Sequence, residues 1–306
     1  MPGMRTTIPI GLGLAAAVVV AASFLGGIWW GFDLLANFRV QMAAAALVLT
    51  VVLGLAGSLP GAGLAAVALL VNAAVIAPLF LPAPEASRSE VTVLSFNLLS
   101  SNDNYEEVFA YVVESGADIV FLHEGTEEWE AALAEADLPY EVVSTRAPTF
   151  AFGTIALVPE GAETTDYGFA RTDPRAVEVR WDGYALLGIH PLAPVSEQSA
   201  ELRDEQLAFA ADWARRMRDP AIVAGDFNTT PWTHAFRTLF GTEKFTNTQR
   251  GYGFEATWRA GTIWQVPIDH IVVTSDLTVV DRTVGPAMGS DHLPVFAEIG
   301  PRKLGP

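Results

Sequence analysis

The sequence predicts an α/β sandwich domain preceded by three transmembrane helices. Three observations support this prediction. Three uncharged apolar runs precede residue 83, strand-like and helix-like segments follow one another after residue 90, and acidic, amide and imidazole side chains recur where strand-like runs end. The first observation separates a membrane part from a water-soluble part, and the other two indicate an enzyme with its active site at a sheet edge.

The apolar runs cover residues 8–30, 40–58 and 61–81. Each has roughly the 20 residues that a bilayer-spanning helix needs. A cleaved signal peptide would account for the first run but would leave the second and third unexplained. We therefore expect three retained spans in a multi-pass protein of the cell membrane, with the lipid bilayer as a partner.

The loop between the first two runs is aromatic, as is typical of a membrane interface. Asp33 and Arg39 are its only charges. Arg5 favours a cytoplasmic amino terminus and Arg39 opposes it. With three spans, a cytoplasmic start places the catalytic domain outside the cytoplasm, and the absence of cysteine is compatible with that side. The aromatic residues that bracket this loop are Trp29, Trp30, Phe32 and Phe38.

The predicted division is a membrane anchor over residues 1–83, a linker over 84–90, a catalytic domain over 91–300 and a tail over 301–306. All but one of the 35 acidic residues and all but two of the 18 basic residues lie after residue 83. That part is acidic and long enough to bury the core of one domain. The short linker keeps it at the membrane surface.

The soluble part begins with a β-α-β pattern. A strand over residues 91–96 leads to Asn97, a helix over 104–114 is closed by Gly116, and a buried strand over 118–122 leads to Glu124. Further strands are predicted over residues 140–143, 153–158, 176–180, 184–190, 221–224, 268–274 and 293–299.

Three more helices are expected. Thr126 caps one that runs through Ala136, and the longest covers residues 197–217, with an apolar stripe that we assign to the core. Thr230 followed by Pro231 predicts a third helix through about residue 239. That helix would begin just after residues 225–228, a position that favours phosphate binding.

Hydrolysis of a phosphate ester needs a hard cation, an oriented water and donors for the phosphoryl oxygens. Glu124 follows a buried strand, where a carboxylate is costly unless it is paired, so a metal ligand is preferred to a surface carboxylate. Asp226 and Asn228 are two apart, and in an extended segment they point to the same side. For Asn228 a turn-forming role remains the alternative.

Histidines supply the rest of the pattern. Asp269-His270 and Asp291-His292 each border an apolar strand, and such pairs become specific only together with the motif at residues 225–228. His190 ends a strand and is followed by proline, with a structural role as its alternative. We assign structural roles to His123 and His234.

Together these motifs resemble the endonuclease/exonuclease/phosphatase superfamily over about residues 90–300. The resemblance implies a four-layer α/β/β/α sandwich, DNase I-like, with Mg²⁺ or Mn²⁺ in the site. The motifs that carry it are Ser95-Phe96-Asn97, Leu122-His123-Glu124, His190, Gly225-Asp226-Phe227-Asn228, Ile268-Asp269-His270 and Ser290-Asp291-His292.

The resemblance also implies a role for each site residue. Glu124 would be the principal metal ligand, with Asn97 and Asp291 close by. Asp226 and Asn228 would orient the water and the phosphate. The remaining roles are transition-state stabilisation by His292 with Asp269, and contact with a phosphate oxygen by His190. One departure is His123, where the family usually has glutamine.

The substrate is the least determined property. The three spans and the segments around residues 190, 225–231 and 257 look most like a membrane-anchored, VanJ-like branch, which implies a lipid-linked phosphate or pyrophosphate. A surface nuclease is disfavoured by the acidic charge, and a non-catalytic membrane-bound domain is disfavoured because every motif position is present. No obligate protein partner is evident. The arginines that would line a nuclease groove are Arg171, Arg175, Arg250 and Arg259.

Overall fold

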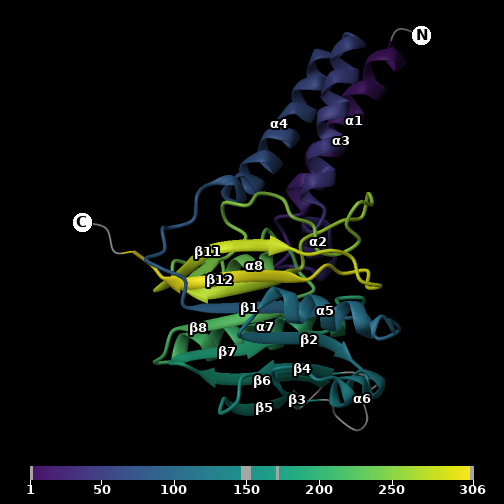
Figure 1. The fold of residues 1–306 in the computed structure, drawn as a ribbon. Helices are drawn as coiled ribbons and strands as arrows, with labels where there is room; N and C mark the ends of the chain where they lie inside the picture. The colour runs from purple at the N-terminus through teal and green to yellow at the C-terminus, as the bar shows by residue number, and fades with distance from the viewer. Residues whose placement is uncertain (1–2, 146–152, 170–171, 304–306) are drawn as a thin grey trace.

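The computed structural model describes residues 3–145, 153–169 and 172–303. The soluble part consists of two six-stranded mixed sheets that pack face to face, with helices on their outer faces (Figure 1). The predicted α/β/β/α layering is therefore confirmed.

The first sheet has the strand order β11-β12-β1-β2-β4-β3. In it β1 and β2 run parallel, whereas β12 is antiparallel to β1. The outer face of this sheet is covered by α5 and α6, through an apolar cluster that includes Val108 and Trp129. The bounds are β1 Val91–Asn97, α5 Tyr105–Ser115, β2 Ile119–Gly125, α6 Glu127–Glu135, β3 Glu141–Ser144, β4 Gly153–Val158, β11 Leu277–Val284 and β12 Val295–Pro301.

The second sheet has the order β5-β6-β7-β8-β10-β9. Here β7 and β8 run parallel, and β10 is antiparallel to β8. Its outer face is covered by α7 and α8, which bury Leu207 and Phe236 against it. The bounds are β5 Glu163–Phe169, β6 Thr172–Trp181, β7 Tyr184–Gly188, α7 Glu197–Arg216, β8 Ala221–Asp226, α8 His234–Leu239, β9 Phe245–Asn247 and β10 Asp269–Thr274.

The strand directions bring the polar motifs to one rim. The parallel strands β1 and β2 end there, as do β7 and β8, whereas the antiparallel β10 and β12 begin there. Asp269 at the start of β10 lies opposite Asp226 at the end of β8. The apolar core between the sheets holds the two halves of this rim together, with Phe121 from one sheet and Ile222 from the other.

The strands β5, β9 and β11 were not predicted from the sequence, and the helix α8 begins later than predicted. The edge strand β5 is mostly exposed and polar, so it lacks the apolar pattern that identifies a strand, while β9 is short and β11 carries Asp281 and Arg282. The predicted start at Thr230 is wrong, because Thr233 caps α8 by accepting the N–H of Phe236. The motif at residues 225–228 therefore does not directly precede a helix.

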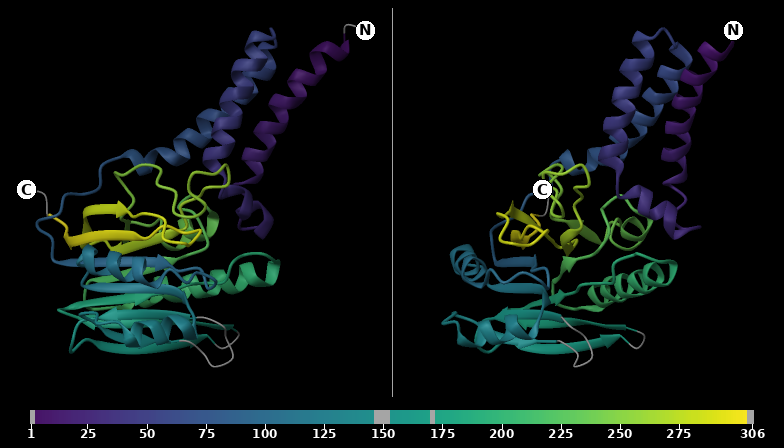
Figure 2. Two further views of the ribbon diagram at one scale, coloured as in Figure 1. Left: turned by 45° about the vertical axis from the view of Figure 1, so that its right-hand side comes forward. Right: turned by 90° about the vertical axis from the view of Figure 1, so that its right-hand side faces the viewer.

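The N-terminal helices, which the sequence predicts to be a membrane anchor and which are called the anchor below, form a bundle that projects from the domain (Figures 1 and 2). Within the described residues, only Leu59–Phe80 is long and apolar enough to cross a membrane. A second candidate arises if α2 and α3, bent by 67°, count as one span, and the apolar part of α1 is shorter. The three spans expected from the sequence are therefore not supported, because at most two segments of the described residues pass this test, by length and composition. The helices are α1 Gly3–Ala22, α2 Trp30–Ala36, α3 Arg39–Leu55, α4 Leu59–Ile76 and the 3₁₀ helix η1 Ala77–Phe80.

The expected interfacial loop contains α2, which docks onto the two-sheet domain. Asp33 is buried, its Oδ2 atom lies 3.2 Å from Nη2 of Arg203, and its Oδ1 atom accepts the N–H of His234 at 2.6 Å. Asn37 accepts the N–H of Thr230 at 3.0 Å. The predicted linker lies along the end of β12, where the N–H of residue 87 donates to the carbonyl of residue 301.

We predict that Arg203→Met destabilises the protein, because it leaves the Asp33 carboxylate buried without its cation. Loss of one partner of a buried pair costs about 3 kcal/mol, which thermal unfolding in detergent should detect as a lower midpoint. Arg216→Met on the same helix is the control, since the Arg216 side chain is 79% exposed and its pairing with Asp212 is at the surface. Equal midpoints in the two variants would contradict the docking role of Arg203.

Candidate active site

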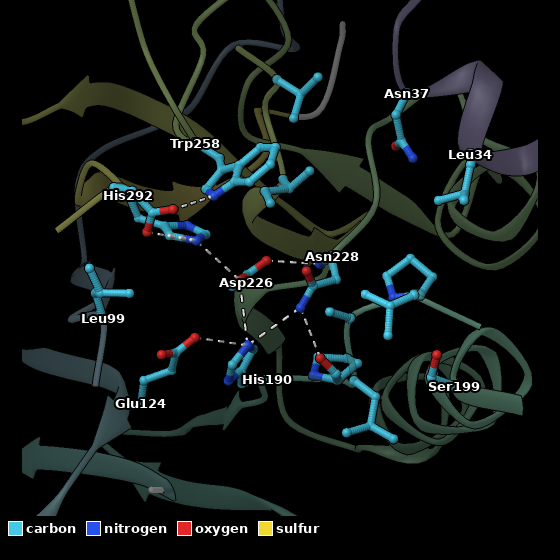
Figure 3. A pocket seen from close by; sticks show the side chains of 18 of the residues that line it. Leu34, Asn37, Leu99, Glu124, His190, Ser199, Asp226, Asn228, Trp258 and His292 are labelled. Carbon is cyan, nitrogen blue, oxygen red and sulfur yellow. Dashed lines mark hydrogen bonds and ion pairs between the residues drawn. The ribbon is translucent and has the colours of Figure 1, made fainter. Parts of the chain in front are cut away.

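The predicted site residues meet at the rim where the strands of both sheets end. A pocket of about 750 Å³ opens there (Figure 3). Asn97 and Asp269 do not line the pocket themselves. They form hydrogen bonds with two residues that do, Glu124 and His292 respectively. All eight candidates are therefore close together. Those that line the pocket are Glu124, His190, Asp226, Asn228, Asp291 and His292.

Glu124 has a backbone conformation that is unfavourable for a side-chain-bearing residue. Its φ is 57°, and the pairing of β2 with β4 shifts register between His123 and Gly125. A left-handed conformation at such a residue costs about 1–2 kcal/mol, and bulges of this kind redirect side chains. The carboxylate points into the pocket (Figure 3), where Oε2 accepts the N–H of Ser100 at 3.0 Å.

Asn97 joins the two acidic groups nearest the centre of the site. Its Nδ2 atom donates to Oε1 of Glu124 and to Oδ2 of Asp226, each at 3.1 Å. Its Oδ1 atom accepts the N–H of Leu99. To offer this oxygen to a metal ion, as the family resemblance implies, the amide would have to turn over.

Asp226 is buried at the end of β8. The residue before it, Gly225, has to be a glycine. A Cβ atom at this position would lie 1.8 Å from the carbonyl oxygen of Ile189. Burial works to raise the pKa of Asp226, but the charge of His292 and hydrogen bonds from His190 and the N–H of Asn228 bring it well below its usual range. Asp226 therefore remains ionised at neutral pH.

The extended segment expected over residues 226–228 ends at Asp226. Asn228 has a φ of 51°, and its N–H donates to Oδ1 of Asp226 at 2.8 Å. This is a local side-chain turn, formed by the aspartate rather than by the asparagine. The side chain of Asn228 donates to the carbonyl of Pro191 at 3.0 Å and lies 3.4 Å from Nε2 of His190. It still faces the pocket (Figure 3).

His190 lies between two carboxylates. Its Nε2 atom is 3.5 Å from Oδ2 of Asp226 and 4.0 Å from Oε1 of Glu124. Burial alone would lower the pKa of His190, but the hydrogen bond to Asp226 and the two negative charges raise it above the ordinary value. The ring is therefore protonated more readily than an ordinary imidazole.

His292 and Asp269 form a buried pair. Nδ1 of His292 lies 2.9 Å from Oδ2 of Asp269, and its Nε2 atom faces Asp226 at 3.7 Å. Burial opposes protonation, yet the charges of Asp269 and Asp226 raise the pKa of His292 to about 10. Thr257 fixes the pair, because its hydroxyl accepts the N–H of Asp269 at 3.1 Å. An imidazolium ion directed at the pocket can stabilise negative charge on a phosphoryl group.

Asp291 lies at the mouth of the site and is partly exposed. Its Oδ2 atom accepts the indole N–H of Trp258 at 2.8 Å. The adjacent Ser290 donates to the carbonyl of Asn97 at 2.7 Å and accepts the N–H of His292. These bonds attach the loop before β12 to the end of β1.

The histidines assigned structural roles lie outside the pocket lining. His123 is fully buried, with Nε2 3.3 Å from the hydroxyl of Ser95 and Nδ1 3.1 Å from that of Thr154. Burial is the main cause that lowers the pKa of His123 to about 3, so the ring is neutral. His234 contributes its backbone N–H to Asp33 of the anchor.

The donors suit a hard divalent cation. Asp226, Asp269 and His292 offer ligand atoms that all lie within 4.8 Å of one another. Asp269 is engaged by His292 and does not line the pocket. The carboxylates that face the pocket are those of Glu124, Asp226 and Asp291. Carboxylate oxygens grouped in this way are the ligands that Mg²⁺ and Mn²⁺ prefer.

Sequence reasoning missed the contribution of the anchor to the pocket. Leu34, Asn37 and Phe38 form part of its lining, although they precede the catalytic domain by many residues. The available signal was Asp33 and Asn37, two polar residues four positions apart in an otherwise apolar and aromatic segment. That spacing places both on one face of a helix, as expected for a helix that docks on protein.

A family model of the endonuclease/exonuclease/phosphatase family matches residues 94–292. The chain belongs to this family. The match includes every strand end and loop that supplies a candidate site residue, from Asn97 to His292. The family predicted from the motifs is thereby confirmed. No curated protein matches the sequence significantly.

Solved structures share the fold. Truncated TDP2 of Caenorhabditis elegans is 17% identical, with 69% of this chain and 97% of that chain covered and a TM-score of 0.55. TDP2 of D. rerio in complex with a single-strand DNA product is 16% identical, with 69% and 98% covered and a TM-score of 0.58. A mannosyl-6-phosphatase of Bacteroides thetaiotaomicron is 17% identical, with 69% and 99% covered and a TM-score of 0.54. These similarities show a DNase I-like fold.

The His292–Asp269 pair generates a pH prediction for the metal-free protein. The imidazole of His292 should remain protonated through neutral pH and lose its proton near pH 10. Asp269→Asn removes the main negative charge beside the ring, so its pKa should fall. NMR of labelled histidine can follow this, because the chain has only five histidines. A titration of His292 that is the same in both proteins would contradict the pairing.

Proposed function

We propose that this protein is a membrane-anchored, metal-dependent phosphoesterase whose favoured substrate is a lipid-linked phosphate or pyrophosphate at the membrane surface. The observation that carries the proposal is one pocket with two kinds of wall. One side presents Glu124, Asp226 and His292, and another presents apolar residues that include Leu34 and Phe38 of the anchor.

The chain's own residues divide the chemical work. Asp226, which stays ionised, orients the attacking water together with Asn228. Protonated His292, supported by Asp269, stabilises the negative charge that develops on the phosphoryl oxygens, and His190 contacts one of them. Mg²⁺ or Mn²⁺, held by Glu124 and Asp291 with Asn97 close by, would neutralise phosphate charge and lower the pKa of a bound water.

Membrane attachment is supported by the surface of the anchor. Apolar side chains are exposed along its helices, such as Leu12, Val51 and Leu70, and extensive exposed apolar surface marks a membrane contact. Arg39 is buried in the bundle, where it lies over the ring of Phe24 and donates to Asn72. It is therefore a packing residue and a weak guide to topology.

An extracytoplasmic catalytic domain follows if the bundle crosses the membrane. The helix α1 begins at the end of the bundle far from the catalytic domain (Figure 1). Arg5 near that end favours the cytoplasmic side, although its side chain lies outside the described part of the chain. A helical bundle joined to a domain of this family is what supports the proposed assignment to the VanJ-like branch.

Nucleic acid is a weaker candidate, even though one structural neighbour was solved with a DNA product. Among the described residues that line the pocket there is no lysine or arginine, whereas DNA-binding sites present such residues to phosphates. Arg175 is bonded to Asp166, and Arg259 lies over the ring of Trp258. Arg171 is outside the described residues. A non-catalytic binding domain is disfavoured because every motif position reaches the pocket or its support.

Metal dependence is tested by removing one ligand charge. Glu124→Gln should reduce hydrolysis of bis(p-nitrophenyl) phosphate and of polyprenyl pyrophosphate by orders of magnitude, and EDTA should abolish it until Mg²⁺ or Mn²⁺ is restored. Glu135→Gln makes the same charge change at the exposed end of α6 and should leave activity unchanged. Wild-type turnover by Glu124→Gln, or hydrolysis in the presence of EDTA, would contradict the proposed metal-dependent mechanism.

Topology is tested by access from outside the cell. Protease added to intact cells should remove the catalytic domain if it is extracytoplasmic. Complete protection in intact cells, together with digestion after lysis, would show the opposite orientation.

A further inference from the structure

The wall of the pocket contributed by the anchor is apolar and lies across from the acidic residues. Leu34 projects from α2 toward the pocket, on the side opposite Leu99 and Glu124 (Figure 3). Phe38 follows one turn later and lines the same pocket. A phosphate group needs only the polar side, so this wall faces a part of the substrate that is not phosphate.

The apolar lining continues beyond α2. The segment 191–195, Val266 and Ile268 complete it. Val195 is 82% exposed at the mouth of the pocket. A pocket with a small ionic end and a long apolar side fits a molecule with the same division, a phosphate joined to a hydrocarbon chain.

The apolar wall is held in a fixed position. On the domain side, Asp33 is paired with Arg203, which also donates to the carbonyl of Asn228 at 3.3 Å. On the anchor side, Gln41 of α3 donates to the carbonyl of Gln265 at 2.7 Å. A fixed wall can discriminate between ligands, because it does not adapt to each of them.

An exposed apolar patch adjoins the pocket wall at Phe38. Phe38 packs edge-on against Trp264 with their ring centroids 5.9 Å apart. Trp264 and its neighbour Ile263 are 53% and 74% exposed. Exposed large apolar side chains beside an apolar helical bundle are suited to contact a hydrocarbon chain.

We infer that Leu34 and Phe38 of the anchor are specificity-determining residues, which bind the hydrocarbon segment adjacent to the phosphate of a lipid phosphate. This inference rests on the proposed phosphoesterase function. It assigns the anchor a part in substrate selection, in addition to attachment. A substrate with a longer hydrocarbon chain buries more apolar surface against α2 and is therefore preferred.

The test uses the full-length protein in detergent with three soluble prenyl pyrophosphates of increasing length, dimethylallyl, geranyl and farnesyl. Wild-type kcat/KM should rise by about tenfold for each isoprene unit that reaches the wall. In Leu34→Ser and Phe38→Ala the ratio of farnesyl to dimethylallyl hydrolysis should collapse toward one. Leu35→Ser is the matched control, since Leu35 lies on the same helix, is exposed and does not line the pocket.

A further variant, Leu34→Trp, distinguishes a change in specificity from a failure to fold. Leu34→Trp should fill the pocket, so that it turns over dimethylallyl pyrophosphate but discriminates against the farnesyl ester. Ratios that stay at the wild-type value in Leu34→Ser, Phe38→Ala and Leu34→Trp would overturn the inference and leave the phosphoesterase function intact. Absence of hydrolysis of any phosphate ester with Mg²⁺ or Mn²⁺ would instead overturn the function itself.

Discussion

The face-to-face packing of two mixed sheets is the constraint on which the site depends. Because β1 and β2 run parallel in one sheet and β7 and β8 run parallel in the other, their carboxyl ends meet at one rim. The apolar core between the sheets fixes the distance between the two halves of that rim. Asn97 and Asp226 are 129 residues apart in the chain, yet they share a hydrogen bond of 3.1 Å.

This arrangement buries negative charge, and the rest of the site compensates for it. A buried carboxylate is stable only with partners. Asp226 has the N–H of Asn228, the amide of Asn97 and two histidines, while Asp269 has His292. The same charges keep His292 protonated, so the groups that make the fold electrostatically acceptable are also those that can stabilise a phosphoryl transition state.

The N-terminal helices add residues to this site from outside the segment that matches the family, residues 94–292. Helix α2 and the two residues after it contribute a buried aspartate to a pair with Arg203, an asparagine to the backbone of Thr230, and an apolar wall to the pocket. The N-terminal helices and the pocket are therefore structurally connected through the loop that carries Asn228. A domain cut from these helices would lose one wall of its pocket.

The sequence by itself determined the family, the sandwich and the residues that gather at the rim, because strand patterns and the motifs around Glu124, Asp226 and His292 are local. Tertiary structure alone decided the left-handed turns at Glu124 and Asn228, which depend on neighbouring strands and loops. It also decided the docking of α2. An aromatic, mostly apolar segment is equally suited to lipid and to a protein surface, and only the partners of its few polar side chains distinguish the two.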